Sequence, residues 1–139
     1  MPNVIKWTMD KRVLHIVTSC DTKQDCMTCC NEIVSVIRNK TQKGHSFMLF
    51  MDWTRVNVAN LSCVPVVVRF MKQNKEHNRA RINGTAIVMA SKSMRGMLNM
   101  CFVIQKPVTE VKMFKEQELA YGFIRSKLGT DAQVAVDSR

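Results

Sequence analysis

The chain has 139 residues, a common size for a single domain, so one hydrophobic core is the default expectation. Hydrophobic residues make up 46% of the sequence and charged residues 23%, a composition that excludes wholesale disorder. No apolar run reaches the roughly 18 residues that a membrane span requires, and Lys6, Asp10 and Lys11 interrupt any signal-like stretch near the N-terminus. We therefore expect a soluble, cytoplasmic protein without a membrane span.

The first half of the chain predicts two short strands, a helix and a buried strand. Residues 4–9 and 12–19 predict the short strands, joined as a hairpin. Asp21 followed three residues later by Gln24 is a capping-box pattern, which predicts a helix start there and a helix running to about residue 43, before Gly44. The apolar run 46–53 predicts a central strand that is buried on both faces.

Helices and strands continue to alternate in the second half. Helices are predicted over residues 61–77 and 116–128, and strands over 85–90 and 108–114. Between these two strands, Ser91 or Ser93 is expected to cap a further helix, which Pro107 ends. The apolar stripe of this helix would be Met94, Met97, Leu98, Cys101 and Ile104, and that of the last helix Leu119, Ala120, Phe123 and Leu128.

The order of elements is therefore ββαβαβαβα, which predicts an α/β protein. We expect a single mixed, mostly parallel sheet of about five strands with four helices, in which the first strand pairs as an antiparallel edge. One domain over residues 1–129 and a flexible C-terminal tail over 130–139 complete the predicted organisation.

The six cysteines could indicate disulfides, a metal site or redox chemistry. Cys26 and Cys29 form a C-x-x-C, but a zinc site needs a second pair of ligands, and none follows at a suitable spacing. On a helix the cysteines share one stripe with Ile33 and Ile37, so core packing is the favoured interpretation. The sequence predicts neither a metal nor a cofactor.

One strand–turn–helix segment resembles a known family. The strand end Phe50-Met51-Asp52-Trp53 is followed by Asn60-Leu61-Ser62-Cys63, which opens an apolar helix. This pattern resembles the STAS domain of bacterial anti-sigma-factor antagonists, within a SpoIIAA-like group that also includes lipid-binding relatives. There a strand ending in aspartate leads to Asp-Ser-Ser-Gly. Ser62 falls on the serine that the family phosphorylates, while Asn60, Leu61 and Cys63 replace the acidic residue, the first serine and the glycine.

Two helix starts are the candidate sites. The Ser62 hydroxyl could simply cap its helix, and a phosphate there would be stabilised by the same N–H groups. Ser91, Lys92, Ser93 and Arg95 could likewise bind an anion or form an ordinary capped start. Both turns follow parallel strands, so we expect them at the same edge of the sheet, where open α/β sheets commonly bind ligands. No catalytic residues are predicted, because no nucleotide fingerprint or catalytic triad can be read from the sequence.

The leading hypothesis is a non-enzymatic STAS-like module that binds a protein partner. Phosphorylation of Ser62 could regulate this binding. The candidate contact residues are Asn60, Ser62, Cys63, Ser91, Ser93 and Arg95. The first alternative is a small-ligand or lipid-binding domain with an apolar cleft, in which Lys92 and Arg95 meet an acidic head group.

The second alternative is a basic structural subunit with an acidic or nucleic-acid partner, because the formal net charge is +10. No nucleic-acid motif supports that alternative. The one dense cluster of basic residues, Arg69, Lys72, Lys75, His77, Arg79 and Arg81, is interpreted as a solvated face.

Overall fold

The computed structural model describes residues 3–8, 12–40, 46–56, 63–89 and 91–129. The elements in chain order are β1 (Asn3–Thr8), β2 (Val13–Cys20), α1 (Lys23–Lys40), β3 (Phe47–Val56), α2 (Val64–Gln73), α3 (Lys75–Arg81), β4 (Ile82–Val88), α4 (Lys92–Ile104), β5 (Val111–Phe114) and α5 (Gln117–Lys127). None of the helices in this part of the chain is long and apolar enough to cross a membrane. The expected turn at residues 10–11 and the expected tail over 130–139 lie outside the described residues.

The five strands form one sheet in the order β1-β2-β3-β4-β5. β1 pairs with β2 antiparallel, and the other three pairings are parallel. This arrangement confirms the predicted α/β class, the mixed and mostly parallel sheet, and the antiparallel edge strand. β5 forms the opposite edge.

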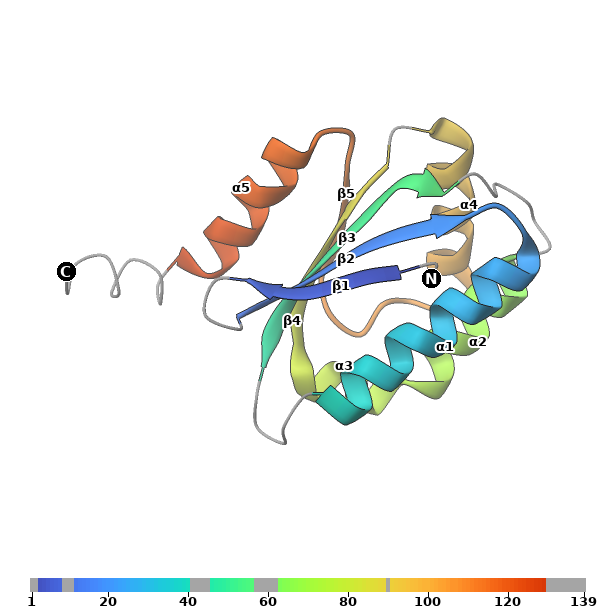
Figure 1. Ribbon diagram of the computed structural model, residues 1–139, viewed down its shortest axis with the longest axis horizontal. Coiled ribbons are helices and arrows are strands. Elements are labelled where there is room, and N and C mark those ends of the chain that lie inside the picture. The colour runs from blue at the N-terminus through green and yellow to red at the C-terminus, as the bar shows by residue number, and fades with distance from the viewer. Residues whose placement is uncertain (1–2, 9–11, 41–45, 57–62, 90, 130–139) are drawn as a thin grey trace.

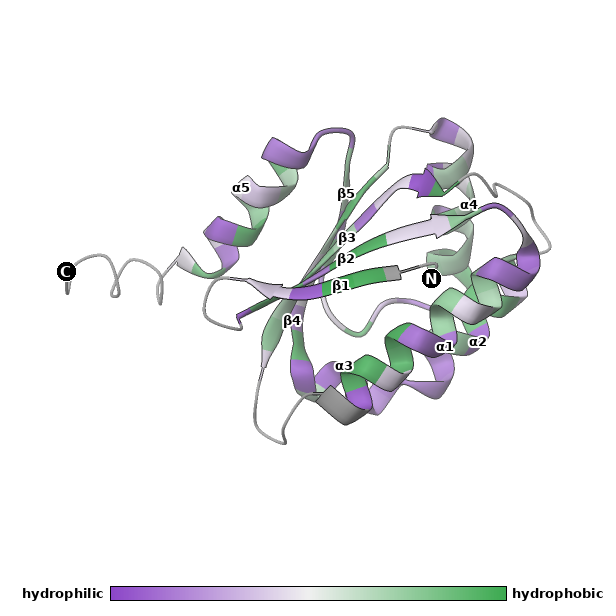
Figure 2. Cartoon of the chain, in the orientation of Figure 1, coloured by the Kyte–Doolittle hydropathy of each residue, from purple (hydrophilic) through white to green (hydrophobic). Residues whose placement is uncertain are grey.

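The helices are divided unequally between the two faces of the sheet. From β2 onwards each parallel strand is added on the same side of the previous one, so right-handed crossovers place the connecting helices on one face. Figure 1 shows α1, α2, α3 and α4 on that face and α5 alone on the other. Most residues of β3 and β4 are buried, as expected for strands covered on both sides. Figure 2 shows hydrophobic stretches in the strands and more polar colours toward the ends of β2 and β3.

Alternate residues of the strands contribute to two hydrophobic cores. Leu14, Ile16, Leu49 and Ile87 belong to the larger core, which the sheet shares with α1, α2 and α4. Residues of the opposite register form the smaller core with α5: Val13, Met48, Phe50, Ala86 and Val88 pack with Ala120, Ile124 and Leu128. The burial predicted for the cysteine stripe of α1 is confirmed at its centre, where Cys29, Ile33 and Ile37 are buried. Cys26 and Cys30 are half-buried.

The described residues contain five helices where the sequence predicted four, because the helix expected over 61–77 is interrupted. The interruption lies at Asn74, which is buried and caps the end of α2. Its backbone N–H and its Nδ2 both donate to the carbonyl of Phe70, at 3.2 and 2.8 Å. The backbone then continues as α3 to Arg81, four residues beyond the predicted helix end.

Other predicted boundaries also differ from the observed ones. The start of α1 is capped by Thr22 rather than Asp21: Thr22 Oγ1 accepts from the backbone N–H of Asp25 at 3.0 Å. The Asp25 carboxylate in turn accepts from the N–H of Asp21, so the capping box is displaced by one residue. β3 extends to Val56, three residues past the predicted strand end at Trp53.

Two residues that the sequence predicted to be buried are exposed. Ile104, at the end of α4, is 59% exposed, and Leu119 of α5 is 58% exposed. α5 instead turns Ala120 and Ile124 toward the sheet. Helical spacing alone predicted that both residues lie in the core. Both are near a helix end, where the apolar stripe of the helix no longer faces the core.

Candidate functional site

The fold brings the starts of α2 and α4 to the same edge of the sheet. β3 and β4 are neighbouring parallel strands, and α2 and α4 follow them and pack against each other. This edge carries Cys63 and the turn Ser91–Arg95, as expected from their positions after parallel strands. Asn60, Leu61 and Ser62 lie outside the described residues.

The start of α4 presents polar side chains to solvent. Ser91 is its N-cap, because Ser91 Oγ accepts from the backbone N–H of Met94 at 3.2 Å. Of the two serines that the sequence offered as caps, Ser91 is therefore the one used. Lys92 and Ser93 are exposed and Arg95 is half-buried, so the first turn of α4 combines backbone N–H groups with two cationic side chains.

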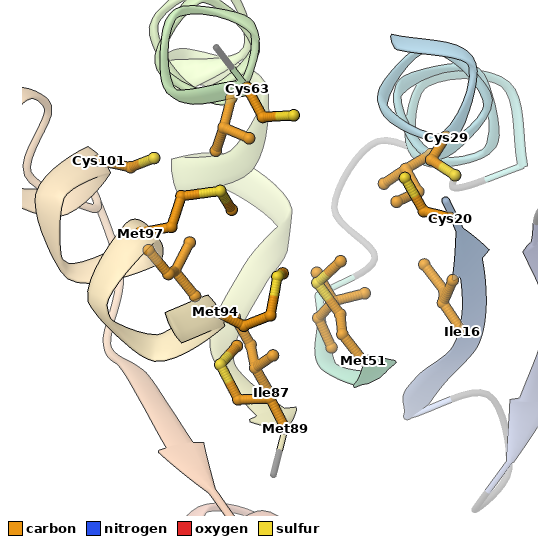
Figure 3. Packing of buried hydrophobic residues seen from close by; sticks show 14 of the residues in the cluster. Ile16, Cys20, Cys29, Met51, Cys63, Ile87, Met89, Met94, Met97 and Cys101 are labelled. Carbon is orange, nitrogen blue, oxygen red and sulfur yellow. The ribbon is translucent and has the colours of Figure 1, made fainter. Parts of the chain in front are cut away.

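The start of α2 is built differently. Cys63 occupies the N-cap position without a side-chain capping bond, and Pro65 lies in the first turn of α2. Only 1% of Cys63 is exposed, and Figure 3 shows its thiol among the buried side chains of the larger core. The Cys63 side chain therefore contributes to packing and not to a surface.

A cavity of about 150 Å³ lies between the sheet and the helices α1, α2 and α4. Its walls are mostly apolar side chains, with Leu49, Met51 and Ile87 on the sheet and Met97 on α4. Figure 3 shows these walls from inside the core, with α4 on one side and Cys20 and Cys29 on the other. Lys106 is exposed and also lines the cavity, which places an opening at the connection between α4 and β5. Lys92 and Arg95 are not among the lining residues.

The opposite face of the sheet carries a polar cluster that sequence reasoning missed. The Tyr121 hydroxyl lies 3.1 Å from His15 Nε2, and the His15 ring stacks on Phe50. Gln117 Nε2 donates to the Asp52 carboxylate at 2.8 Å. These contacts join residues 106 and 65 positions apart, so no local spacing could have indicated them.

Burial and charge both act on this cluster. Desolvation lowers the pKa of His15, and nearby Lys6 lowers it further, while Asp52 opposes the shift. Burial raises the pKa of Tyr121, with a contribution from the Asp52 carboxylate. Asp52 accepts hydrogen bonds from Thr54 and Gln117 and acts on His15 through its charge.

Comparison with known proteins supports the fold. The sequence matches no protein-family model and no curated protein. The structure is similar to the crystal structure of an uncharacterised protein of the DUF3478 family from Shewanella loihica, described as having a SpoIIAA-like fold. The TM-score is 0.56 at 13% sequence identity, and the match covers 88% of this chain and 91% of that chain.

The protein therefore has a SpoIIAA-like fold, which was the fold that the strand–turn–helix resemblance implied. The fold is built on one mixed sheet. At 13% identity, the similarity extends to the fold alone.

Proposed function

We propose that the protein is a non-enzymatic STAS-like module that binds a protein partner through the Ser62 segment and the Ser91–Arg95 turn. The observation that carries this proposal is the start of α4, where Ser91, Lys92 and Ser93 are exposed beside the start of α2. Two cationic side chains and a helix N-terminus suit an acidic partner surface. The chain's net charge of +10 would strengthen the encounter.

Phosphorylation of Ser62 would regulate this contact. A phosphate adds roughly −2 charge at neutral pH, which would weaken an acidic partner's attraction to Lys92 and Arg95. The substitution Ser62→Glu should therefore reduce partner binding while the circular dichroism spectrum stays unchanged. Full partner binding by a folded Ser62→Glu protein would argue against regulation at this serine.

The binding surface can be tested with two matched charge reversals. Lys92 and Lys75 are both exposed lysines at the first residue of a helix, α4 and α3 respectively, and α3 leads into the opposite end of β4. Glutamate is favourable at either position because of the helix dipole, so both variants should fold. Affinity capture from native extract should recover the same partner with wild type and Lys75→Glu, and lose it with Lys92→Glu. Equal recovery with both variants would contradict the proposed surface.

A second candidate function is supported by the apolar cavity. Its walls would accept an aliphatic chain, and Lys106 at the opening would meet an anionic head group. The sequence-based alternative assigned the head-group contact to Lys92 and Arg95. We assign this contact to Lys106 instead, because Lys106 lines the cavity.

Octanoate is a suitable probe for this second candidate. Calorimetric titration should detect octanoate binding to wild type and to Lys92→Glu, and weaker binding to Lys106→Glu. No heat of binding with wild type, or equal affinity for Lys106→Glu, would contradict it. Lys92→Glu and Lys106→Glu therefore separate the two functions, since each variant affects only one of them.

A further inference from the structure

A groove that opens to solvent lies between α1 and α2, which pack against each other on one face of the sheet (Figure 1). We call it the α1–α2 groove. Its volume is about 160 Å³, below the roughly 300 Å³ at which sites for drug-sized ligands begin. Lys92 and Lys106, on which the tests of the two proposed functions depend, are not among its lining residues. A ligand of this groove must therefore be small.

Each of the two helices contributes one arginine to the groove. Arg38 belongs to α1 and Arg69 to α2, and both are exposed. Within the described part of the chain neither arginine takes part in an ion pair. Sequence reasoning grouped Arg69 with the basic residues that follow it along the chain. Only the packing of α1 against α2 adds Arg38, so the sequence did not indicate the pair.

Positive charge dominates this part of the surface. The described residues that line the groove include no aspartate or glutamate, and α2 contains none. Burial lowers the pKa of His77 on α3, and the charges of Arg81 and Arg38 lower it further. Two guanidinium groups at one groove, without a carboxylate to neutralise them, favour the binding of an anion.

Amide side chains supply further hydrogen-bonding groups. Asn31 and Gln73 are exposed, line the groove and carry N–H donors. Asn74 also lines it but is only 5% exposed. Asn74 Nδ2 donates to the Phe70 carbonyl, while Asn74 Oδ1 has no hydrogen-bond partner among the described residues. Buried acceptors without a partner are uncommon in folded proteins, so a ligand with a hydroxyl hydrogen would complete this one.

We propose that the α1–α2 groove binds a small phosphate monoester, whose phosphate group is held between Arg38 and Arg69. A phosphate monoester carries roughly two negative charges at neutral pH, which match two guanidinium groups, whereas a carboxylate carries one. A guanidinium group can donate two parallel hydrogen bonds to phosphate oxygens. Asn31 and Gln73 donate to a remaining oxygen, and a hydroxyl group of the ligand donates to Asn74 Oδ1. The inference does not depend on either proposed function.

Glycerol 1-phosphate is a suitable probe, because it combines a phosphate monoester with free hydroxyl groups. Calorimetric titration of the full chain at constant ionic strength should show saturable binding to wild type. Arg38→Gln and Arg69→Gln should each weaken this binding about tenfold or more, since each removes charged hydrogen bonds. The absence of saturable binding to wild type, or unchanged affinity in both variants, would overturn the proposal.

Arg125→Gln is the matched control. Arg125 is an exposed arginine of α5, on the other face of the sheet, so this variant removes the same charge without altering the groove. It should bind glycerol 1-phosphate as tightly as wild type. Equal losses in Arg38→Gln and Arg125→Gln would indicate a general attraction to the basic chain and would overturn the site. Because these arginines are exposed, all the variants should keep the circular dichroism spectrum of wild type.

Sulfate tests the role of Asn74. It has the charge and the tetrahedral shape of the phosphate group but no hydrogen to donate, so it should bind more weakly than glycerol 1-phosphate. Equal affinities for the two anions would overturn the contact with Asn74 Oδ1.

Vesicles of phosphatidylcholine and phosphatidic acid present the same phosphate monoester at a membrane surface. The basic chain is attracted to such vesicles through its net charge, so Arg38→Gln and Arg125→Gln should sediment with them equally. A loss of sedimentation that is specific to Arg38→Gln, without binding of glycerol 1-phosphate to wild type, would assign the groove to a lipid head group and overturn a small soluble ligand.

Discussion

Ser91 fixes the start of α4 through a single hydrogen bond, from the backbone N–H of Met94 to Ser91 Oγ. Replacing an N-cap serine with alanine typically costs about 1 kcal/mol. Ser91→Ala should therefore lower the free energy of unfolding by about that amount in urea titration. Ser93→Ala is the control, because Ser93 is exposed within the first turn and no capping bond is assigned to it. Equal losses in the two variants would contradict the assignment of Ser91 as the cap.

His15 predicts a pH dependence of stability. Burial and Lys6 hold its pKa in the folded protein below the ordinary value of 6.5, so the unfolded chain binds the proton more readily. As pH falls below about 6.5, the free energy of unfolding should decrease until the folded protein also takes up the proton. His15→Gln should show a smaller decrease between pH 7 and pH 5 in urea titration. Identical pH profiles for the variant and wild type would contradict this account of His15.

Local residue patterns predicted local features well. The cap at Ser91 and the buried centre of the cysteine stripe both follow from spacings of a few residues. The contact between His15 and Tyr121 depends on β2 and α5 meeting across one face of the sheet. Only the completed fold specifies that contact, so the sequence did not indicate it.

At the level of elements, α5 is the only described helix on its face of the sheet. Ile124 is fully buried against that face, whereas Leu119 on the same helix is 58% exposed. Ile124→Ala should lower the free energy of unfolding by about 2–4 kcal/mol, since it leaves a cavity in the smaller core. Leu119→Ala should change it by less than about 0.5 kcal/mol. Similar effects of the two substitutions in urea titration would contradict the docking of α5.

The element boundaries that sequence reasoning misplaced have local physical causes. Valine-rich periodicity predicted one helix over 61–77, but the Asn74 side chain bonds the Phe70 carbonyl and ends α2. The displaced capping box at Thr22 and Asp25 depends on which of two adjacent polar residues turns toward the helix. Periodicity does not contain that information, because both arrangements place the same apolar residues in the core.

At the level of the whole molecule, alternating strands and helices predicted the parallel sheet, and the strand pairings confirm it. The sequence could not show that α5 would cross to the other face, because no crossover connection follows the last strand. The Ser91–Arg95 turn was predicted at the correct edge of the sheet. The cavity and its opening at Lys106 were not localised, since their lining residues come from almost every element on one face.

The central proposal is that this protein, which has a SpoIIAA-like fold, binds a protein partner at the edge containing the Ser91–Arg95 turn. Native mass spectrometry of the full chain, recovered from cell extract under non-denaturing conditions, tests it most directly. The account predicts a complex carrying a protein-sized additional mass, which is lost with Lys92→Glu and retained with Lys75→Glu. A wild-type chain that appears bare, or that carries only a small-molecule mass unaffected by Lys92→Glu, would contradict it.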